Sequence, residues 1–151
     1  VIADKQKKGR GRHGKKWTSY KGNLFVTIFF NFDKINVSLK KMTHLNCSLI
    51  KKLLSFYYKK KISIKAPNDL LINKKKISGI LQEMIKKDNI SYMIVGIGIN
   101  LIKNPKIKNY PTTNLLEVSK KNINKKEIIL KLKKIYEKFI PKFNLYNPSK
   151  I

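Results

Sequence analysis

Residues 70–101, LLINKKKISGILQEMIKKDNISYMIVGIGINL, decide the fold of this 151-residue chain. The segment holds three apolar stretches, which are separated by two polar pairs, Asn73-Lys74 and Asp88-Asn89. Asn and Asp tolerate the backbone of tight turns, so apolar stretches joined by such pairs are typical of β-hairpins. We therefore predict an antiparallel meander with strands over residues 70–72, 77–85 and 90–101.

The sequence before the meander predicts further strands, a loop and a long helix. Residues 38–58 have apolar side chains at helical spacing, and Ser38 can cap the helix N-terminus. Residues 4–23 are polar and contain glycine, which indicates a long loop, and loops of this length are often functional. The strands predicted in this half of the chain are residues 1–3, 24–32 and 62–65.

After the meander the chain becomes helical. Residues 113–118 predict a short helix, and Asn124 with Glu127 forms an approximate capping box at the start of a longer one. Pro141 is predicted to end the longer helix, because proline lacks the backbone donor. Strands grouped between helices indicate an α+β fold, in which a mixed, largely antiparallel sheet has its helices packed behind it.

The net charge of +27 raises the question of a nucleic-acid partner. Of the 35 basic residues only 2 are Arg, and the lysines are spread along the whole length. Lys, Ile and Asn dominate the composition and have A/T-rich codons, so a base-composition bias explains the charge. We interpret the lysines as a solvated surface and expect no nucleic-acid partner.

Other features of the composition suit a soluble, cytoplasmic protein. No apolar run approaches the ~18 residues that a membrane span needs. The single cysteine, Cys47, excludes an internal disulfide, and we expect it to be buried. The chain is long enough for one domain with one sizeable core.

The loop Gly9-Arg10-Gly11-Arg12-His13-Gly14-Lys15-Lys16-Trp17 is the densest chemical signal. Its glycines let the backbone approach a ligand closely, and its cations suit a carboxylate or a phosphate. Both arginines of the chain lie here, which indicates that the guanidinium shape matters. Taken alone, the loop fits either an anion or nucleotide site or a solvated basic loop. Its tryptophan fits either a core anchor or a stacking surface for a base.

Three later segments place polar groups or glycines at strands. In Lys65-Ala66-Pro67-Asn68-Asp69-Leu70, the carboxylate of Asp69 fits either a turn hydrogen bond or a partner for magnesium or an ammonium group. Lys76-Ile77-Ser78-Gly79-Ile80-Leu81 and Val95-Gly96-Ile97-Gly98-Ile99-Asn100 both have glycine inside a strand. Glycine at such a position indicates a bulge or a ligand against the backbone. The second segment lacks the third glycine of a dinucleotide fingerprint.

Together with Gln6 and Gly22-Asn23-Leu24, these segments resemble the biotin–protein ligases of the biotin/lipoate A/B protein ligase family. The order and spacing of the motifs agree over about residues 1–102. The resemblance implies a fold similar to class II aminoacyl-tRNA synthetases and two half-reactions. Biotin and ATP would give biotinyl-5′-AMP, and a lysine of a biotin carboxyl carrier protein would then accept the biotin.

The resemblance also implies roles for individual residues. The biotin-binding residues would be Gln6, Gly9, Arg10, Arg12, Lys76 and Gly79. The ATP-binding residues would be Arg12, Lys15, Trp17, Lys65, Asn68 and Asn100. The catalytic residues would be Arg12, Lys65, Lys76 and Asp69. Asp69 is also the candidate ligand for Mg²⁺, which is the implied cofactor beside ATP.

Two departures from the family pattern affect these expectations. Family members usually have arginine where this chain has His13 and Lys15, so contacts from the loop are expected to be weaker. The family's catalytic domain also begins earlier, with a helix and a Ser/Thr-rich motif that contacts biotin. We therefore expect residues 1–151 to be one catalytic domain without its N-terminal segment, without a helix-turn-helix domain and without a C-terminal barrel. Such a chain would be a poor enzyme or none.

Two alternative functions remain open at the level of sequence. A lipoate–protein ligase or lipoyl transferase would have the same fold and a similar adenylate chemistry, although the glycine–arginine loop favours biotin. A basic nucleic-acid-binding module belongs to a different class, and it predicts salt-sensitive affinity with no dependence on ATP.

Overall fold

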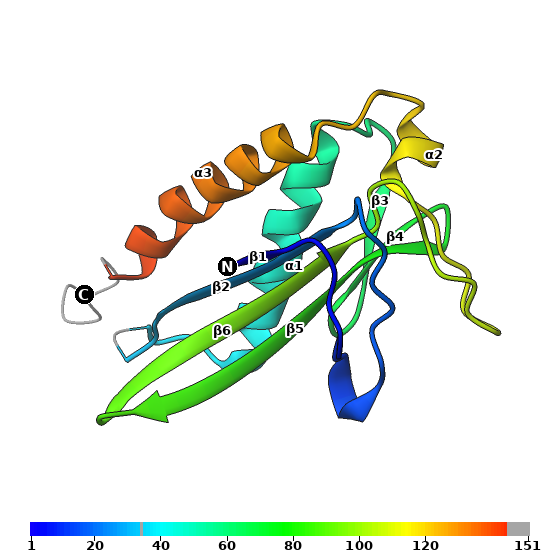
Figure 1. Cartoon of the computed structure of the whole chain (residues 1–151). Coiled ribbons are helices and arrows are strands. Elements are labelled where there is room, and N and C mark those ends of the chain that lie inside the picture. The colour runs from blue at the N-terminus through cyan, green and yellow to red at the C-terminus, as the bar shows by residue number, and fades with distance from the viewer. Residues whose placement is uncertain (34, 145–151) are drawn as a thin grey trace.

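The computed structural model of the chain describes residues 1–33 and 35–144, which form one sheet with helices on one side of it (Figure 1). The strands are β1 (Ile2–Ala3), β2 (Leu24–Asn31), β3 (Ile62–Lys65), β4 (Asp69–Ile72), β5 (Lys75–Lys87) and β6 (Ile90–Ile99). The helices are α1 (Leu39–Ser55), α2 (Leu115–Ser119) and α3 (Lys125–Asn144), and a 3-10 turn forms η1 (Arg12–Gly14). Every predicted strand and helix is present, with ends that differ by a few residues.

The sheet has the strand order β1-β2-β6-β5-β4-β3, and all its neighbouring strands are antiparallel. The predicted meander is therefore confirmed as β4, β5 and β6. In its two turns, φ is 50° at Asn73 and 62° at Lys74, with the same pair of values at Asp88 and Asn89. Two consecutive positive φ angles give a tight turn whose twist matches the flanking strands.

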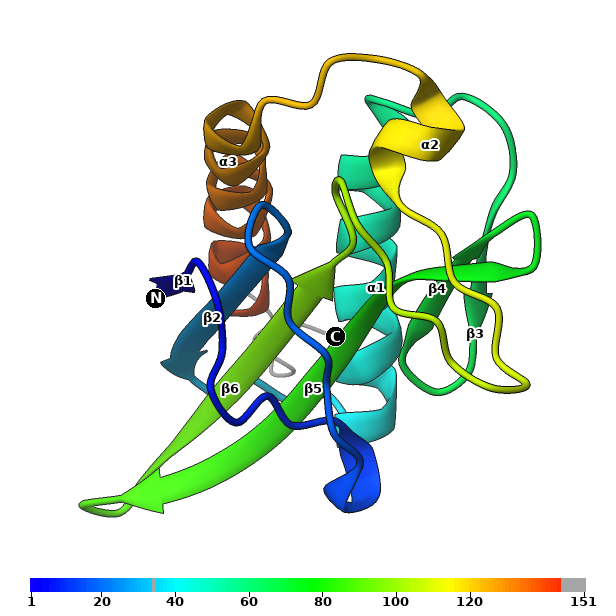
Figure 2. The ribbon, with the colours of Figure 1, turned by 45° about the vertical axis from the view of Figure 1, so that its right-hand side comes forward.

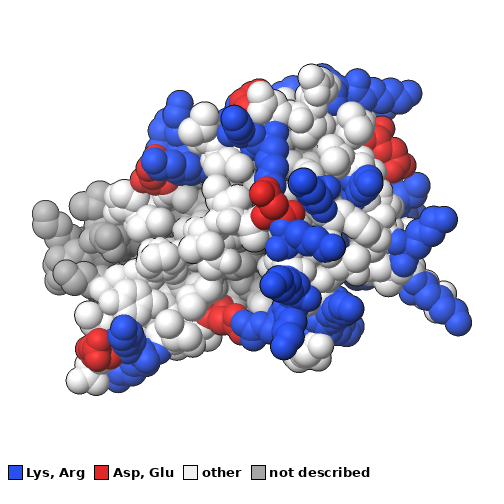
Figure 3. Space-filling model, in the orientation of Figure 1, with Lys and Arg blue, Asp and Glu red and all other residues white. Residues whose placement is uncertain are grey.

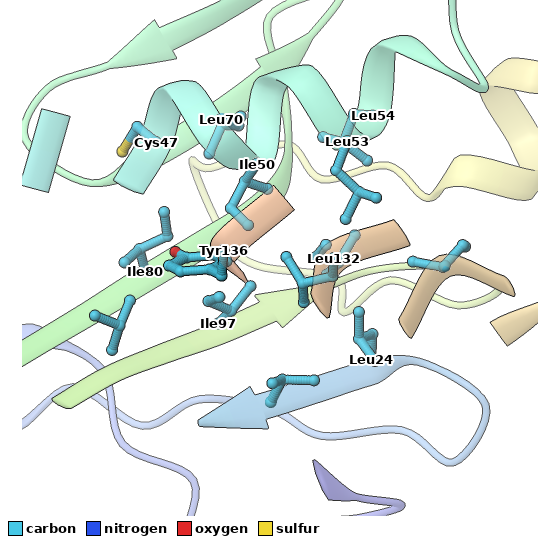
Figure 4. Close-up of a cluster of buried hydrophobic side chains, with 14 of the residues drawn as sticks. Leu24, Cys47, Ile50, Leu53, Leu54, Leu70, Ile80, Ile97, Leu132 and Tyr136 are labelled. Carbon is cyan, nitrogen blue, oxygen red and sulfur yellow. The ribbon is translucent and has the colours of Figure 1, made fainter. Parts of the chain in front are cut away.

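The helices α1 and α3 cover one face of the sheet, and the hydrophobic core lies between them and the strands (Figures 1 and 2). Figure 4 shows Ile50 of α1 and Leu132 of α3 pointing toward Ile80 and Ile97, which are paired on β5 and β6. All four side chains are buried. The predicted cap of α1 is confirmed, because the Oγ of Ser38 accepts a hydrogen bond from the third backbone N–H of the helix at 3.3 Å.

A chain of polar groups, of which Asn46 and Tyr136 are buried, links the two helices to the sheet. The phenol of Tyr136 on α3 donates to the Oδ1 of Asn46 on α1 at 2.9 Å, and the amide of Asn46 donates to the Oε1 of Gln82 on β5 at 2.9 Å. Burial raises the pKa of the Tyr136 phenol, so the hydroxyl remains a donor. Because unpaired polar groups are costly in a core, this chain of bonds fixes both helices relative to the sheet.

Cys47 is buried in the same core, as predicted. Burial, followed by the nearby negative charge of Asp69, raises the pKa of its thiol to about 11. Since the thiolate is the reactive form of cysteine, this residue is a packing group and not a nucleophile at neutral pH.

One local expectation is corrected by the structure. The helix α3 continues past Pro141 to Asn144, so the prediction that Pro141 ends it is wrong. Proline removes one backbone donor, but its fixed φ is helical, and only the final turn follows it here. The long loop predicted over residues 4–23 is present, and it contains η1 and an antiparallel bridge between Arg10 and Lys16.

On the face seen in Figure 3, basic side chains do not form a single continuous stripe. In Figure 3 the Lys and Arg side chains are spread over the right-hand part of the molecule and are interspersed with acidic ones. None of the helices in residues 1–33 and 35–144 combines the length and the apolar character that crossing a membrane requires.

Candidate active site

The candidate site is a cavity of about 710 Å³ on the face of the sheet opposite α1 and α3. Two segments flank it in front of the strands: the loop over residues 4–23 and the segment over residues 101–113 that follows β6 (Figure 2). Strands β2, β5 and β6 form its floor. A cavity of this size can hold a cofactor-sized ligand.

The glycine–arginine loop, residues 9–17, is a small hairpin closed by its own backbone. The N–H of Trp17 donates to the carbonyl of Gly9 at 2.9 Å, and the N–H of Gly11 donates to the carbonyl of Lys15 at 2.6 Å. The tip turns through left-handed backbone at His13 and Gly14, where φ is 53° and 71°. These bonds present Arg12 at the exposed tip, beside the cavity.

Trp17 lies directly on two glycines that face each other across β5 and β6. A Cβ at Gly98 would lie 2.4 Å from Trp17 Cζ2, and a Cβ at Gly79 would lie 2.8 Å from Trp17 Cζ3. The sequence indicated a bulge or a ligand against these glycines, and the group that occupies this space is the indole of the protein itself. Trp17 therefore anchors the loop to the sheet and also lines the cavity.

An ion pair lies at the other end of the cavity. Lys65 and Asp69 are opposite each other in the β3–β4 ladder. Lys76 is the second residue of β5, the strand on the other side of β4. The Nζ of Lys76 lies 2.8 Å from the Oδ1 of Asp69, and the two side chains are only 17% and 15% exposed. The sequence left open whether Asp69 makes a turn hydrogen bond or is the partner of magnesium or an ammonium group. In this geometry its partner is the ammonium group of Lys76.

Tyr110, from the segment after β6, completes this cluster. Its hydroxyl donates to the Oδ2 of Asp69 at 2.6 Å. Its ring lies under the Nζ of Lys65 at 4.2 Å and near the Nζ of Lys76 at 5.6 Å, which are cation–π distances. Burial, followed by the hydrogen bond to Asp69, raises the pKa of the Tyr110 phenol above its usual value. The hydroxyl thus stays protonated and remains a donor at neutral pH.

Two asparagines of the site also hold its backbone together. The amide of Asn68 donates to the carbonyl of Ile80 at 2.7 Å. The amide of Asn100 donates to the carbonyl of Thr113 at 3.1 Å. Both residues line the cavity. Their amide nitrogens are therefore engaged in positioning β5 and the segment after β6.

The described residues do not form a protein-held magnesium site. Both carboxylate oxygens of Asp69 are engaged, one by Lys76 and one by Tyr110. Within residues 1–33 and 35–144, no three His, Cys, Asp or Glu side chains gather where they could hold a metal. The magnesium role predicted for Asp69 therefore gains no support from this geometry.

The cavity brings together the residues that the sequence selected, with one exception. The lining includes every predicted site residue except Gly9: Gln6, Arg10, Arg12, Lys15, Trp17, Lys65, Asn68, Asp69, Lys76, Gly79 and Asn100. Gly9 lies behind the lining, because a Cβ there would be 2.5 Å from the carbonyl oxygen of Trp17. Its role is to let the loop close.

Tyr110, which lines the cavity, and Glu83, which binds the lining residue Arg10, were not predicted. Tyr110 had a weak signal, as a large aromatic residue in a polar loop just before a proline. Glu83 forms two hydrogen bonds to the guanidinium of Arg10, at 3.2 and 3.0 Å. The scarcity of acidic residues, 8 in a chain with 35 basic ones, could have drawn attention to it.

The antiparallel sheet, with helices on one face and a basic cavity on the other, is the class II aminoacyl-tRNA synthetase-like α+β fold. The chain belongs to the biotin/lipoate A/B protein ligase family, whose model matches residues 1–100. The fold class predicted from the sequence is thereby confirmed.

Individual relatives carry the same assignment. The chain is 32% identical over 146 residues to the bifunctional ligase/repressor BirA of Bacillus spizizenii, covering 91% of this chain and 44% of that protein. It is 30% identical over 108 residues to the biotin–[acetyl-CoA-carboxylase] ligase of Paracoccus denitrificans, covering 70% and 45%. The structure of the biotin protein ligase from Aquifex aeolicus in complex with biotin and ATP matches with a TM-score of 0.82 and 32% identity, covering 97% of this chain and 62% of that one. This chain thus spans less than half the length of these two curated relatives.

Proposed function

We propose that this chain carries the adenylation site of an ATP-dependent biotin–protein ligase, a biotin–[acetyl-CoA-carboxylase] ligase. Biotin and ATP would give biotinyl-5′-AMP and pyrophosphate, and the ε-amine of an acceptor lysine would then take the biotin and release AMP. The observation that carries the proposal is the convergence of four separated sequence segments on one cavity. The structural relative that contains both biotin and ATP supports it.

The charges around the cavity suit this chemistry. Attack of a carboxylate on the α-phosphate brings two anions together, so the barrier falls when fixed cations surround both. Lys65 and Lys76 lie on strands at one end, and Arg12 lies at the loop tip on the other side. Among the described residues none forms an ion pair with Arg12, so its guanidinium is available to the biotin carboxylate and the α-phosphate.

The remaining roles follow from position. Gln6, Arg10 and Gly79 are proposed at the biotin end, and Trp17 and Asn100 beside the adenine. In the second half-reaction the glycine–arginine loop would cover the adenylate, because a mixed anhydride is readily hydrolysed when water reaches it.

The proposed cofactors are ATP and Mg²⁺, with biotin as the substrate. Since Asp69 is engaged by Lys76 and Tyr110, the ion would be held mainly by ATP phosphates and water, as magnesium commonly is. The proposed partner is the biotin carboxyl carrier domain of a biotin-dependent carboxylase, and the proposed location is the cytoplasm. Residues 1–151 are proposed to belong to a single catalytic domain.

The test is biotin-dependent exchange of pyrophosphate into ATP by the full-length protein that contains residues 1–151, combined with calorimetry using biotin and lipoate. We expect exchange only when biotin is present, and heat of binding with biotin but not with lipoate. Exchange supported by lipoate alone would establish the lipoate alternative. Salt-sensitive retention of DNA or RNA, with neither exchange nor biotin binding, would establish the nucleic-acid module.

A further inference from the structure

Tyr110 contacts three charged residues of the site through two different parts of its side chain. The hydroxyl donates to Asp69 at 2.6 Å, while the ring lies 4.2 Å from the Nζ of Lys65 and 5.6 Å from that of Lys76. Asp69 uses its other oxygen for Lys76 at 2.8 Å. A neutral side chain is therefore the common neighbour of both cations that are proposed to meet the phosphates.

The backbone beside Tyr110 is tied to Lys76. The N–H of Lys76 donates to the carbonyl of Pro111 at 2.8 Å, and the N–H of Thr113 donates to the carbonyl of Lys76 at 2.9 Å. This is the short parallel bridge between Lys76 and Thr112, which adds the segment to the edge of β5. The backbone that carries Tyr110 is thus hydrogen-bonded to Lys76, the same residue whose ammonium group the phenol helps to orient.

Side-chain hydrogen bonds hold the base of the segment closed. The amide of Asn104 donates to the Oγ1 of Thr112 at 2.9 Å, and the amide of Asn114 donates to the Oδ1 of Asn104 at 2.7 Å. The hydroxyl of Thr112 also donates to the carbonyl of Pro105. Tyr110 consequently sits on a loop that is fixed at its base, which is what a residue that sets the position of other groups requires.

We propose that Tyr110 is a positioning residue of the adenylation step, which rests on the function proposed above. Its hydroxyl holds the Asp69 carboxylate so that the other oxygen fixes the Lys76 ammonium in the cavity. Its ring lies against the Lys65 ammonium at 4.2 Å and directs it toward the same space. Neither contact needs Tyr110 to touch the reacting atoms.

A double-mutant cycle tests the part of the proposal that concerns Asp69. Tyr110→Phe keeps the ring and removes the hydroxyl, so we expect kcat for pyrophosphate exchange to fall about tenfold, as for the loss of one hydrogen bond to a charged group. The KM values for biotin and ATP should stay within about twofold. Because the hydroxyl acts through Asp69, Tyr110→Phe should cause almost no further loss in an Asp69→Ala background.

Tyr58→Phe is the matched control, since the Tyr58 hydroxyl makes a hydrogen bond to Asn73, away from the cavity, at 3.4 Å. It should leave kcat unchanged. The proposal is overturned if Tyr110→Phe behaves like Tyr58→Phe. It is also overturned if Tyr110→Phe lowers kcat by the same factor with and without Asp69, or if its only effect is a lower melting temperature.

A second measurement tests the ring and does not depend on ligase activity. Limited acylation of the chain with an amine-reactive ester, read by mass spectrometry, gives a rate for Lys65 relative to the other lysines. The ring lies against the Lys65 ammonium and limits the approach of the ester to it, so Tyr110→Leu should make Lys65 react about two- to fivefold faster. Tyr110→Phe should leave that rate unchanged.

These two measurements separate the inference from the function on which it rests. A full-length protein containing residues 1–151 that shows no biotin-dependent exchange would contradict the proposed function, and the acylation of Lys65 would still decide whether the ring of Tyr110 holds that lysine. Equal acylation of Lys65 in wild type, Tyr110→Phe and Tyr110→Leu would overturn the placement of Tyr110.

Discussion

The two basic sides of the cavity are held in different ways. Lys65 and Lys76 project from strands, and Lys76 is paired with Asp69 where both side chains are more than four-fifths buried. Arg10 and Arg12 lie on a loop, and the side chain of Arg10 is 70% exposed even though Glu83 binds its guanidinium. One side thus contains a preformed and largely buried ion pair, and the other is a solvated hairpin that closes through its own backbone.

This difference predicts how each side responds to change. A charge that has lost most of its water depends on its partner, so removing one member of the Lys76–Asp69 pair costs both stability and activity. An exposed charge is hydrated whether or not it is paired, so the loop arginines can turn toward a ligand at little cost to the fold. Mutations on the loop should therefore separate activity from stability, and mutations in the cluster should not.

The largest effect is expected on the loop side. Arg12→Ala should reduce biotin-dependent pyrophosphate exchange by about a hundredfold or more, because it removes a charge-assisted contact from the transition state. Arg10→Ala should cost less, since Arg10 is proposed only at the biotin end. Both variants should unfold in urea within about 0.5 kcal/mol of wild type. An Arg12→Ala protein with full exchange activity would refute its proposed role.

The cluster side should lose stability together with activity. Lys76→Met removes one phosphate contact and leaves the Asp69 carboxylate without its ammonium partner, so we expect about a hundredfold less exchange and about 2 kcal/mol less stability. The double variant Lys76→Met/Asp69→Leu replaces the pair with apolar side chains. It should recover the stability measured by urea denaturation but not the activity. A double variant as unstable as the single one would mean that the buried pair is not the cause.

Some of this architecture could be predicted from the sequence because its signals are local. The turns at Asn73 and Asp88 and the cap at Ser38 depend on residues only a few positions apart, and all three are confirmed. The end of α3 was not predicted correctly, because Pro141 interrupts a hydrogen bond without interrupting helical φ.

The site also divides into features that local sequence signals predict and features that depend on distant residues. Motifs such as residues 9–17 predicted which residue types gather around the cavity. They could not show that Trp17 fills the space above Gly79 and Gly98, because that contact joins positions some 60 to 80 residues apart. Tyr110 and Glu83 were missed for a similar reason, since each acts on a residue that is distant in the sequence.

A pair of alanine variants tests how firmly the loop is anchored to the sheet. Gly98→Ala places a Cβ 2.4 Å from the indole of Trp17, whereas Gly96→Ala, two residues earlier on β6, would meet its nearest neighbour at an ordinary 3.5 Å. We expect Gly98→Ala to lose about 1–3 kcal/mol of stability, as overpacked sites do, and Gly96→Ala to lose much less.

Fluorescence gives an independent measurement, because Trp17 is the only tryptophan. Displacement of the indole toward water should shift the emission maximum to longer wavelength in Gly98→Ala and leave it in place in Gly96→Ala. Identical spectra and stabilities for the two variants would show that Trp17 is not seated on the glycines in solution.

The smallest effect is expected from the exposed pair that joins the loop to β5. Glu83→Gln weakens the two hydrogen bonds to Arg10, and an exposed pair of this kind contributes only about 0.2–1 kcal/mol. Both arginines of the chain lie in this loop, so a protease specific for arginine cleaves nowhere else and reports only on loop opening. Cleavage after Arg10 or Arg12 should become roughly two- to fivefold faster in Glu83→Gln, because cleavage follows the population of the open form.

Glu137→Gln removes the exposed Lys133–Glu137 pair on α3 instead and should leave the rate unchanged. Biotin with ATP should slow cleavage of wild type and of Glu83→Gln alike, since the ligand would then hold the arginines directly. Equal cleavage of the wild type, Glu83→Gln and Glu137→Gln would mean that the loop is held only by the contact of Trp17 with Gly79 and Gly98.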